Sequence, residues 1–172
     1  MLVASDGQTA AFRRSDGRLA ILHSGRDTFT IKEWLAADAD ARAPNDPSLA
    51  NDVVCDAIGC IGRFGDGRIV SMVLGIEAFS EDCTRAAVVV SPREAPSSVC
   101  AAKIVDRQVW RTYGAVALRW TGDRFEQTTA RPAGLERPWV DSPARTKARI
   151  QLPTEPNSPD ATPRADDLAA ED

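Results

Sequence analysis

The sequence predicts a single mixed α/β domain, a layered sandwich of short, largely antiparallel strands with three short helices. Short, mostly apolar runs alternate with Asp-Gly turns, which is typical of antiparallel strands joined by hairpins. Other segments place apolar residues at helical spacing. Because strands and helices do not alternate strictly, the pattern argues against a Rossmann-like parallel sheet. A length of 172 residues suits one domain.

The composition excludes several classes of function. The chain has 27% charged and 43% hydrophobic residues, as ordinary globular proteins do. Its net charge of −4 argues against a strongly basic nucleic-acid-binding surface. No apolar run reaches the roughly 18 residues of a membrane-spanning helix, and no signal peptide is recognisable. The single histidine, His23, excludes any site that needs two histidine ligands.

The first 23 residues predict an antiparallel meander. Strands are expected at Leu2–Ala4, Thr9–Arg13 and Leu19–Leu22. The turns between them contain Asp6-Gly7 and Asp16-Gly17, and glycine tolerates the positive φ that such turns require.

A helix is expected next, because Thr30 and Glu33 have the spacing of a capping box. Ile31, Trp34 and Leu35 then fall on one face, and the helix should end near Asp38. The following segment, residues 41–52, is rich in Pro, Asn and Asp and is expected to be a loop.

The middle of the chain predicts further strands and a second helix. Gly75 to Cys83 should be helical, with Ile76, Phe79 and Cys83 on one stripe. The continuous apolar run Ala86–Val90 is typical of a strand that is covered on both faces. The remaining strands expected here are Val53–Asp56, Cys60–Phe64 and Ile69–Leu74.

The last predicted elements lie between Cys100 and Thr129. A strand at Cys100–Val105 is followed by a short helix, for which Asp106 can serve as N-cap. Gly114 stands where a helix C-terminus favours a left-handed residue. Ala115–Trp120 and Phe125–Thr129 then form a final hairpin.

Composition divides the chain into a body, residues 1–140, and a C-terminal tail, residues 141–172. The tail contains no Trp, Phe or Cys, five of the eleven prolines, and seven acidic against four basic residues. Such a segment buries too little apolar surface to offset its ordering entropy, so we expect it to be disordered. A partner-binding peptide is the alternative.

The four cysteines, Cys55, Cys60, Cys83 and Cys100, leave three interpretations open. Two local disulfides, Cys55–Cys60 and Cys83–Cys100, are the prediction, because small domains with an even cysteine count are often extracytoplasmic. Four buried thiols are the second interpretation. A zinc site is the third, although only the first pair has the close spacing that zinc sites use.

Other polar residues give weaker signals. His23 lies beside Ser24, but neighbours along a strand point to opposite faces, so we expect a structural histidine and not a catalytic base. Glu81 and Asp82 form an adjacent acid pair, which we expect on the solvated face of the second helix. The glycines around Gly65 lack the lysine and following helix of a phosphate-binding loop.

Basic residues are interleaved with aromatic residues near the end of the body. Such a pattern can bind single-stranded nucleic acid by stacking and phosphate contact, although the acidic net charge weakens the inference. The aromatic residues are Trp110, Trp120 and Phe125. The candidate DNA contacts are Arg107, Arg111, Arg119 and Arg124, with Arg131 nearby.

Several segments together resemble one protein family. They are Leu2–Arg13, Asp16–Leu22, Asp38–Arg42, the series Cys55, Cys60 and Cys83, Ala86–Ser91, Ile104–Arg107, Gly114–Leu118, Thr129–Pro132 and Arg137–Trp139. In order and spacing over residues 2–140, they are similar to the C-terminal region of ComEC-type competence proteins, most closely the form found in alphaproteobacteria.

The resemblance implies a function in DNA uptake. ComEC-type proteins are inner-membrane channels that pass single-stranded DNA into the cytoplasm during natural transformation. Many carry a metallo-β-lactamase-like domain that is thought to face the periplasm and to degrade the strand that is not imported. The segment Asp6–Ala10 is similar to the Asp-x-Gly-Gln-Gly-Asp-Ala turn that opens this domain.

The sequence departs from the family at its metal site. That site is built on His-x-His-x-Asp-His with further histidines and an aspartate, whereas this chain has only His23. We therefore expect a degenerate, metal-free version of the fold and carry over no catalytic residue. The sequence indicates no cofactor and no small-molecule substrate.

The function that we predict is a non-catalytic domain or fragment of a ComEC-type channel. Its partners are the membrane portion of the channel and single-stranded DNA. One alternative is a nuclease that uses carboxylates from Asp6, Asp16 or Asp106 to bind Mg²⁺ or Mn²⁺. The other is a protein-interaction module with no role in DNA uptake.

The location follows from the same resemblance. Because the sequence begins at Met1, directly before the first strand, we expect a detached part of a longer reading frame or a domain expressed alone. As part of a channel, the domain would be associated with the inner membrane and face the periplasm. Expressed alone, it would be cytoplasmic.

Overall fold

The computed structural model describes residues 1–25, 27–96 and 100–132. Within them the chain forms two five-stranded sheets and three α-helices. Six of the eight strand pairings are antiparallel and two are parallel. The predicted mixed α/β class, with largely antiparallel strands and three short helices, is therefore confirmed for this part of the chain. The predicted tail, residues 141–172, lies outside the described residues.

The first sheet is antiparallel throughout and has the strand order β10-β9-β1-β2-β3. The first three strands form the predicted meander. The short strand β1 pairs with β2 on one side and with β9 on the other, so it joins the start of the chain to the last hairpin. The strands are β1 (Leu2–Val3), β2 (Thr9–Arg13), β3 (Leu19–His23), β9 (Val116–Trp120) and β10 (Phe125–Thr129).

The second sheet has the order β4-β5-β6-β7-β8 and is mixed. Its first three strands are antiparallel neighbours, whereas β6, β7 and β8 run parallel. The predicted buried run becomes β7, all of whose side chains are buried. The strands are β4 (Val53–Cys55), β5 (Gly59–Arg63), β6 (Ile69–Val73), β7 (Val88–Val90) and β8 (Lys103–Val105).

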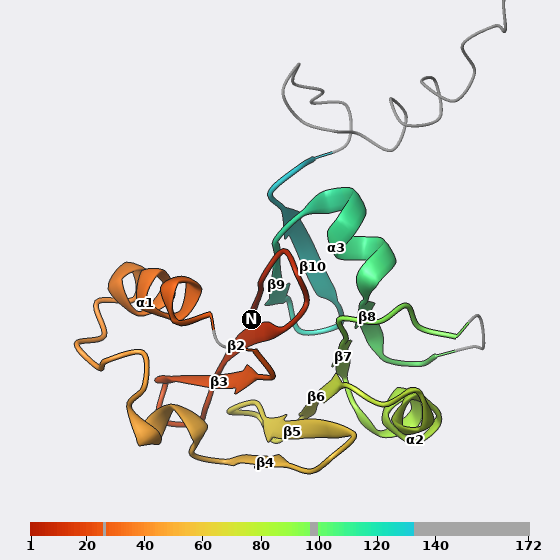
Figure 1. The fold of residues 1–172 in the computed structure, drawn as a ribbon, viewed down its shortest axis with the longest axis horizontal. Coiled ribbons are helices and arrows are strands. Elements are labelled where there is room, and N and C mark those ends of the chain that lie inside the picture. Colours follow the sequence, from red (N-terminus) through yellow and green to blue (C-terminus); the bar gives the residue numbers. More distant parts are fainter. Residues whose placement is uncertain (26, 97–99, 133–172) are drawn as a thin grey trace, which may run out of the picture. The chain divides into compact units, whose positions relative to one another are not determined.

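Three apolar clusters arrange these elements in four layers. One cluster combines inward-facing residues of both sheets, so the sheets pack face to face. A second joins the outer face of β2 and β3 to helix α1 (Thr28–Ala37) and the 3-10 turn η1 (Pro47–Ala50). A third joins the outer face of β6 and β7 to helix α2 (Phe79–Arg85). Helices α1 and α2 therefore cover opposite sides of the pair of sheets (Figure 1).

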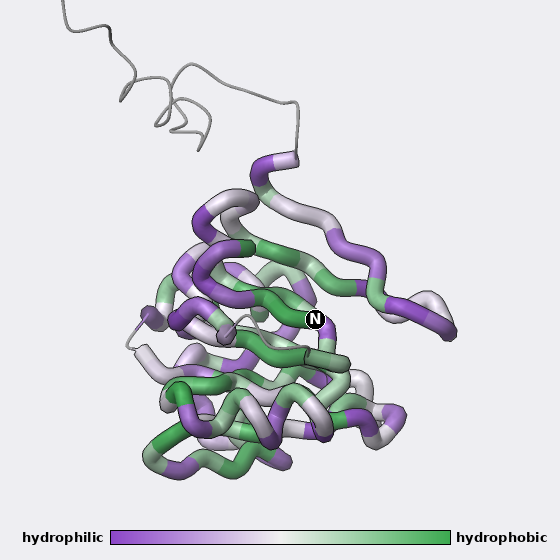
Figure 2. The backbone as a smooth tube through the Cα atoms, turned by 90° about the vertical axis from the view of Figure 1, so that its right-hand side faces the viewer, coloured by the Kyte–Doolittle hydropathy of each residue, from purple (hydrophilic) through white to green (hydrophobic). Residues whose placement is uncertain are grey.

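The two sheets are in close contact where Phe12 of β2 faces Gly62 of β5. Phe12 is fully buried, and a Cβ atom at Gly62 would lie 2.4 Å from its Cζ atom. Glycine is therefore required at this position because the aromatic ring of the opposite sheet fills the space that a side chain would need. Figure 2 shows that hydrophobic stretches of the chain alternate with hydrophilic ones.

The predicted capping box of the first helix is wrong. Helix α1 begins at Thr28, and its N-cap is Asp27, whose carboxylate accepts hydrogen bonds from the backbone N–H groups of Phe29 and Thr30. A carboxylate at this position pairs the first unpaired N–H groups of the helix, so the helix starts before Thr30. The predicted end near Asp38 is correct.

The loop after α1 is anchored by an almost fully buried ion pair between Asp40 and Arg42. Arg42 also donates to the carbonyl of Leu19 at 2.7 Å and to Ser48 Oγ at 3.2 Å, so one guanidinium joins this loop, β3 and η1. Its hydrogen bonds hold the pKa of Asp40 well below its usual range. Residues 41–52 were expected to be a loop, and the structure places one 3-10 turn, η1, within them.

The second predicted helix is divided in two. Residues Ile76–Ala78 form a 3-10 turn, η2, and α2 follows it. Phe79 and Cys83 are buried as predicted, but Ile76 is exposed, so its expected place on the buried stripe is wrong. A 3-10 turn has three residues per turn, which changes the direction in which Ile76 points relative to the α-helix.

The third helix, α3 (Arg107–Tyr113), has the predicted ends. The side chain of Asp106 accepts a hydrogen bond from the N–H of Val109 at 3.1 Å and serves as N-cap. Gly114 closes the helix with a φ of 73°. The predicted hairpin of β9 and β10 follows, with Trp120 paired to Phe125.

Candidate functional site

The carboxyl ends of β6, β7 and β8 meet at one edge of the second sheet. In sheets with parallel strands this is the edge at which functional groups usually lie. Ser91 directly follows β7, and Asp106 directly follows β8. The turn between β1 and β2 reaches the same edge, because Gly7 lies against Ser91. The arrangement therefore places Ser91, Asp106 and Gly7 where a catalytic site would be expected.

Both carboxylate oxygens of Asp106 are engaged with the backbone. Oδ1 accepts from the N–H of Val109, and Oδ2 accepts from the N–H of Ala95 at 2.9 Å. Asp106 is buried, so these bonds replace its contacts with water. The carboxylate thus joins the start of α3 to the loop after β7.

Ser91 is also buried and fully bonded. Its hydroxyl donates to the carbonyl of Val73 at 2.7 Å and accepts from the N–H of Arg93 at 3.0 Å. Its own carbonyl accepts a hydrogen bond from the indole Nε1–H of Trp110, also at 3.0 Å. The indole therefore lies against the end of β7.

This donor set does not fit a metal ion. The oxygens of Ser91 and Asp106 are already occupied by backbone partners, and Trp110 lies against Gly7. Among the described residues, no group of three or more His, Cys, Asp and Glu side chains is placed to hold a metal. The metal site that the family resemblance would imply has no matching residues at this edge.

The three carboxylates of the nuclease hypothesis do not converge. Asp6 precedes β2 and Asp16 follows it, so they lie at opposite ends of a five-residue strand, roughly 15 Å apart or more. Asp16 is paired with Arg14, and this hydrogen bond lowers the pKa of its carboxyl group. Asp106 has the structural partners described above. The geometry therefore argues against a shared metal site for Asp6, Asp16 and Asp106.

His23 has a structural partner. Its Nδ1 is hydrogen-bonded to the hydroxyl of the buried Thr9, its register partner across the hairpin, at 2.9 Å. The hydroxyl of Ser24 instead donates to the carbonyl of Gln8 at 3.3 Å. The two neighbouring side chains thus have different partners.

The acid pair on α2 is only partly solvated. Glu81 forms an exposed ion pair with Arg85, one turn further along the helix. Asp82 instead accepts a hydrogen bond from the hydroxyl of the buried Ser71 at 2.7 Å. The expectation that both carboxylates lie on a solvated face is therefore wrong for Asp82, which connects α2 to β6.

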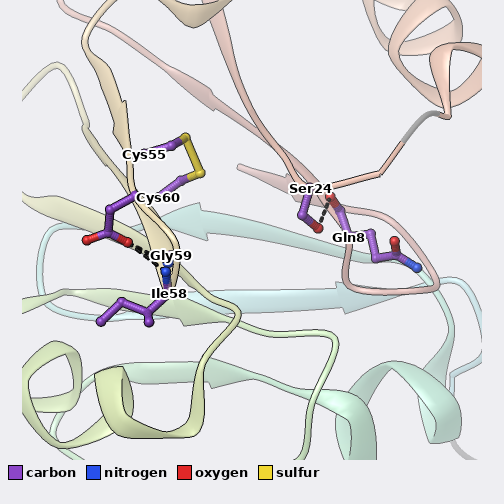
Figure 3. The surroundings of a disulfide bond; sticks show 7 residues. Gln8, Ser24, Cys55, Ile58, Gly59 and Cys60 are labelled. Carbon is purple, nitrogen blue, oxygen red and sulfur yellow. Dashed lines mark hydrogen bonds between the residues drawn. A yellow bond between two sulfur atoms is a disulfide. The ribbon is translucent and has the colours of Figure 1, made fainter.

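The structure contains the two disulfides expected from the sequence. Cys55 and Cys60 are register partners on β4 and β5, and their sulfurs are bonded across the hairpin (Figure 3). The next pair along the ladder, Asp56 and Gly59, carries the backbone hydrogen bond. The cysteines therefore form a non-hydrogen-bonded pair, in which side chains approach closely enough to be joined.

The second disulfide joins α2 to the segment before β8. Cys83 is buried on α2, and Cys100 packs against the same apolar cluster. The described residues contain no free cysteine. Disulfides persist in oxidising compartments, so the two bonds are compatible with a periplasmic location.

The four candidate DNA contacts fall on two elements. Arg107 and Arg111 lie on α3, four residues apart, whereas Arg119 lies on β9 and Arg124 in the turn that follows. All four are exposed. Within the described part of the chain, no ion pair joins any of them to a carboxylate. Arg131, by contrast, donates to the carbonyl of Trp110 at 3.3 Å.

An aromatic cluster that the sequence pattern did not identify surrounds Arg68. Its guanidinium carbon lies 3.7 Å from the ring centroid of Trp120, 4.9 Å from that of Phe125 and 5.6 Å from that of Phe64. Asp66 accepts a hydrogen bond from Arg68 Nε at 2.9 Å, and this pairing lowers the pKa of Asp66. Arg68 and Phe64 belong to the β5–β6 turn, far in sequence from the hairpin that they contact.

This cluster borders a pocket of about 500 Å³ between the β5–β6 turn and the last hairpin. The turn is fixed to the first sheet because the N–H of Gly65 donates to the carbonyl of Arg13 at 3.1 Å. Cationic and aromatic side chains therefore meet at one opening. The lining includes Phe64, Arg68, Arg119, Trp120 and Phe125, together with Arg13 and Arg14.

Comparison of the chain with protein-family models, with curated proteins and with solved structures found no match. In the part of the chain that the structure describes, no helix is both long enough and apolar enough to cross a lipid bilayer.

Replacing Gly7 tests how closely the β1–β2 turn packs against Trp110 and Ser91. Gly7 has a φ of 68°, and a Cβ atom there would lie 2.5 Å from Trp110 Nε1 and 2.6 Å from the carbonyl oxygen of Ser91. Gly7→Ala should therefore lower the free energy of unfolding by about 2–3 kcal/mol, combining backbone strain with a lost hydrogen bond. Urea denaturation measures the loss.

Gly17→Ala is the matched control. Gly17 has a φ of 78°, but nothing lies within 4 Å of the added Cβ. Only the backbone strain of the positive φ remains, so the free energy of unfolding should fall by about 1 kcal/mol. Equal losses in the two variants would contradict the close contact between Gly7, Trp110 and Ser91.

Removing each disulfide by paired Cys→Ala substitutions should destabilise the domain unequally. The Cys83–Cys100 bond closes the longer loop, with a sequence separation of 17 against 5 for Cys55–Cys60. Loop entropy predicts losses of about 3 and about 2 kcal/mol, respectively. Urea denaturation of the oxidised variants measures both values. Detection of four free thiols in the unreduced wild-type protein would contradict the pairing.

Proposed function

We propose that this chain is a non-catalytic domain of a ComEC-type DNA-uptake channel and acts at the periplasmic face of the inner membrane. The observation that carries the proposal is the series of segments over residues 2–140 that resembles the C-terminal region of that family. The two sheets pack face to face with helices on both outer sides, which agrees with the layered mixed α/β sandwich that the sequence predicts.

We propose a non-catalytic domain because the polar side chains at the carboxyl ends of the parallel strands are already hydrogen-bonded within the protein. A metal-activated nucleophile requires ligands that are free to coordinate, with an open position for water. At the carboxyl ends of the parallel strands, Ser91 and Asp106 are instead hydrogen-bonded to backbone partners, and the indole of Trp110 donates to the carbonyl of Ser91. These contacts favour a scaffold over a hydrolytic centre.

The proposed partners follow from the same resemblance. They are the membrane-spanning portion of the channel and the single strand of DNA that it conducts. The two disulfides support an oxidising location, because such bonds persist in the periplasm and are rare in the cytosol. A small-molecule substrate and a cofactor form no part of the proposal.

Deletion of the segment that encodes residues 1–132 tests the proposal in the source organism. We expect the frequency of natural transformation to fall to that of a strain without the channel, and the wild-type sequence to restore it. If the domain has no hydrolytic carboxylates, the Asp6→Asn and Asp16→Asn variants should also restore transformation to the deletion strain. Both substitutions keep a side-chain acceptor in the turn concerned.

Two outcomes would contradict the proposal. Transformation at the wild-type frequency after deletion would favour a protein-interaction module without a role in DNA uptake. Loss of complementation by Asp6→Asn or Asp16→Asn, with the protein present at normal levels, would favour the carboxylate nuclease.

A further inference from the structure

The tip of the β9–β10 hairpin exposes an aromatic surface. Trp120 and Phe125 are register partners with ring centroids 4.9 Å apart. Trp120 leaves 39% of its surface exposed, which is unusual for the largest apolar side chain next to a packed cluster. A flat exposed ring such as that of Trp120 is a surface on which unpaired nucleic-acid bases stack.

Arg68 fixes the orientation of these rings from the inner side. Its guanidinium stacks on Trp120 and is held by Asp66, so the platform is set before any ligand arrives. Arg68 Nη1 is buried and has no hydrogen-bond partner among the described residues.

The cations that remain for a ligand are on the hairpin itself. Arg13, Arg14 and Arg68 line the pocket, but each is paired with an aspartate. Arg119 and Arg124 are exposed and form no ion pair with a carboxylate in the described residues, although Glu126 is the register partner of Arg119. Positive charge is therefore left on Arg124, which directly precedes Phe125, and on Arg119, which precedes Trp120 in β9 and so points to the opposite face of the hairpin.

We propose that this hairpin tip binds a nucleotide unit of single-stranded DNA, with a base stacked on Trp120 and the neighbouring phosphates on Arg124 and, from the opposite face of the hairpin, on Arg119. The inference rests on the proposed function for the identity of the strand and adds the site at which it is held. Single strands are favoured over duplexes because stacking on a protein ring requires an unpaired base. Arg107 and Arg111, which lie on α3, are not part of this site.

The test is the binding of a fluorescein-labelled oligo(dT) to the oxidised full chain, followed by fluorescence anisotropy at several salt concentrations. Trp120→Leu keeps apolar bulk but removes the ring, and should weaken binding about tenfold. Trp120→Phe keeps a ring and should retain most of the affinity. Thermal unfolding of both variants checks that the protein is still folded. If the inference is correct, only the Trp120→Phe variant retains stacking.

Charge variants separate phosphate contact from general attraction. Arg119→Ala with Arg124→Ala should lower the dependence of log K on log salt by about 1.4, since each phosphate contact with a single strand contributes about 0.7. The matched control, Arg107→Ala with Arg111→Ala, removes the same charge from α3 and should leave that slope unchanged.

Three results would overturn the inference. They are equal binding by wild type and Trp120→Leu, equal loss of slope in the two double-arginine variants, and no binding of the oligonucleotide by the wild-type chain. None of these decides the proposed function, which depends on transformation in the cell. A chain that fails to bind DNA but is required for transformation would therefore place its role in contacts with the channel.

Discussion

The close contact between Phe12 and Gly62 sets the spacing of the two sheets, on which the other layers depend. The buried ring fills the place of a side chain at Gly62, where a Cβ atom would lie 2.4 Å from it. From Phe12, aromatic contacts continue outward: Phe12 meets Phe64 edge to face at 5.8 Å, and Phe64 lies 6.0 Å from Phe125. Phe125 then contacts Trp120 at the surface. The contact that closes the core therefore also positions the hairpin that we propose to bind DNA.

The same sandwich has two ends with different chemistry. At the carboxyl ends of β6, β7 and β8, every polar group described above is bonded within the protein, and the indole of Trp110 donates to the carbonyl of Ser91. At the other site, Trp120 is exposed and Arg119 and Arg124 are unpaired within the described residues. Burial and bonding at the edge favour stability, whereas exposed rings and charges favour binding. This contrast is the physical basis for proposing a binding domain in place of a hydrolytic one.

Local signals in the sequence predicted most of the elements but not how they meet. The Asp-Gly turns identified the meander, and Asp106 and Gly114 marked both ends of α3. The start of α1 was missed because Asp27 and Thr30 are both good caps, and only the structure shows which one accepts the helix N–H groups. Arg68 was missed for a different reason. It lies more than fifty residues before Trp120 in the sequence, and their stacking depends on the packing of the two sheets, which no local pattern encodes. Exposure of Asp82 was overestimated for the same reason, since its partner Ser71 belongs to another element.

The central proposal is that this domain acts without a metal-dependent hydrolytic centre. The most direct measurement is a nuclease assay of the purified, oxidised chain on labelled single- and double-stranded DNA, with Mg²⁺, Mn²⁺ or Zn²⁺ added, and with or without a chelator. The account predicts that both DNA forms stay intact under every condition. Hydrolysis that follows the protein through purification and is abolished by the chelator would contradict it, because the carboxylates that such chemistry needs would then have to converge in a way that this fold does not provide.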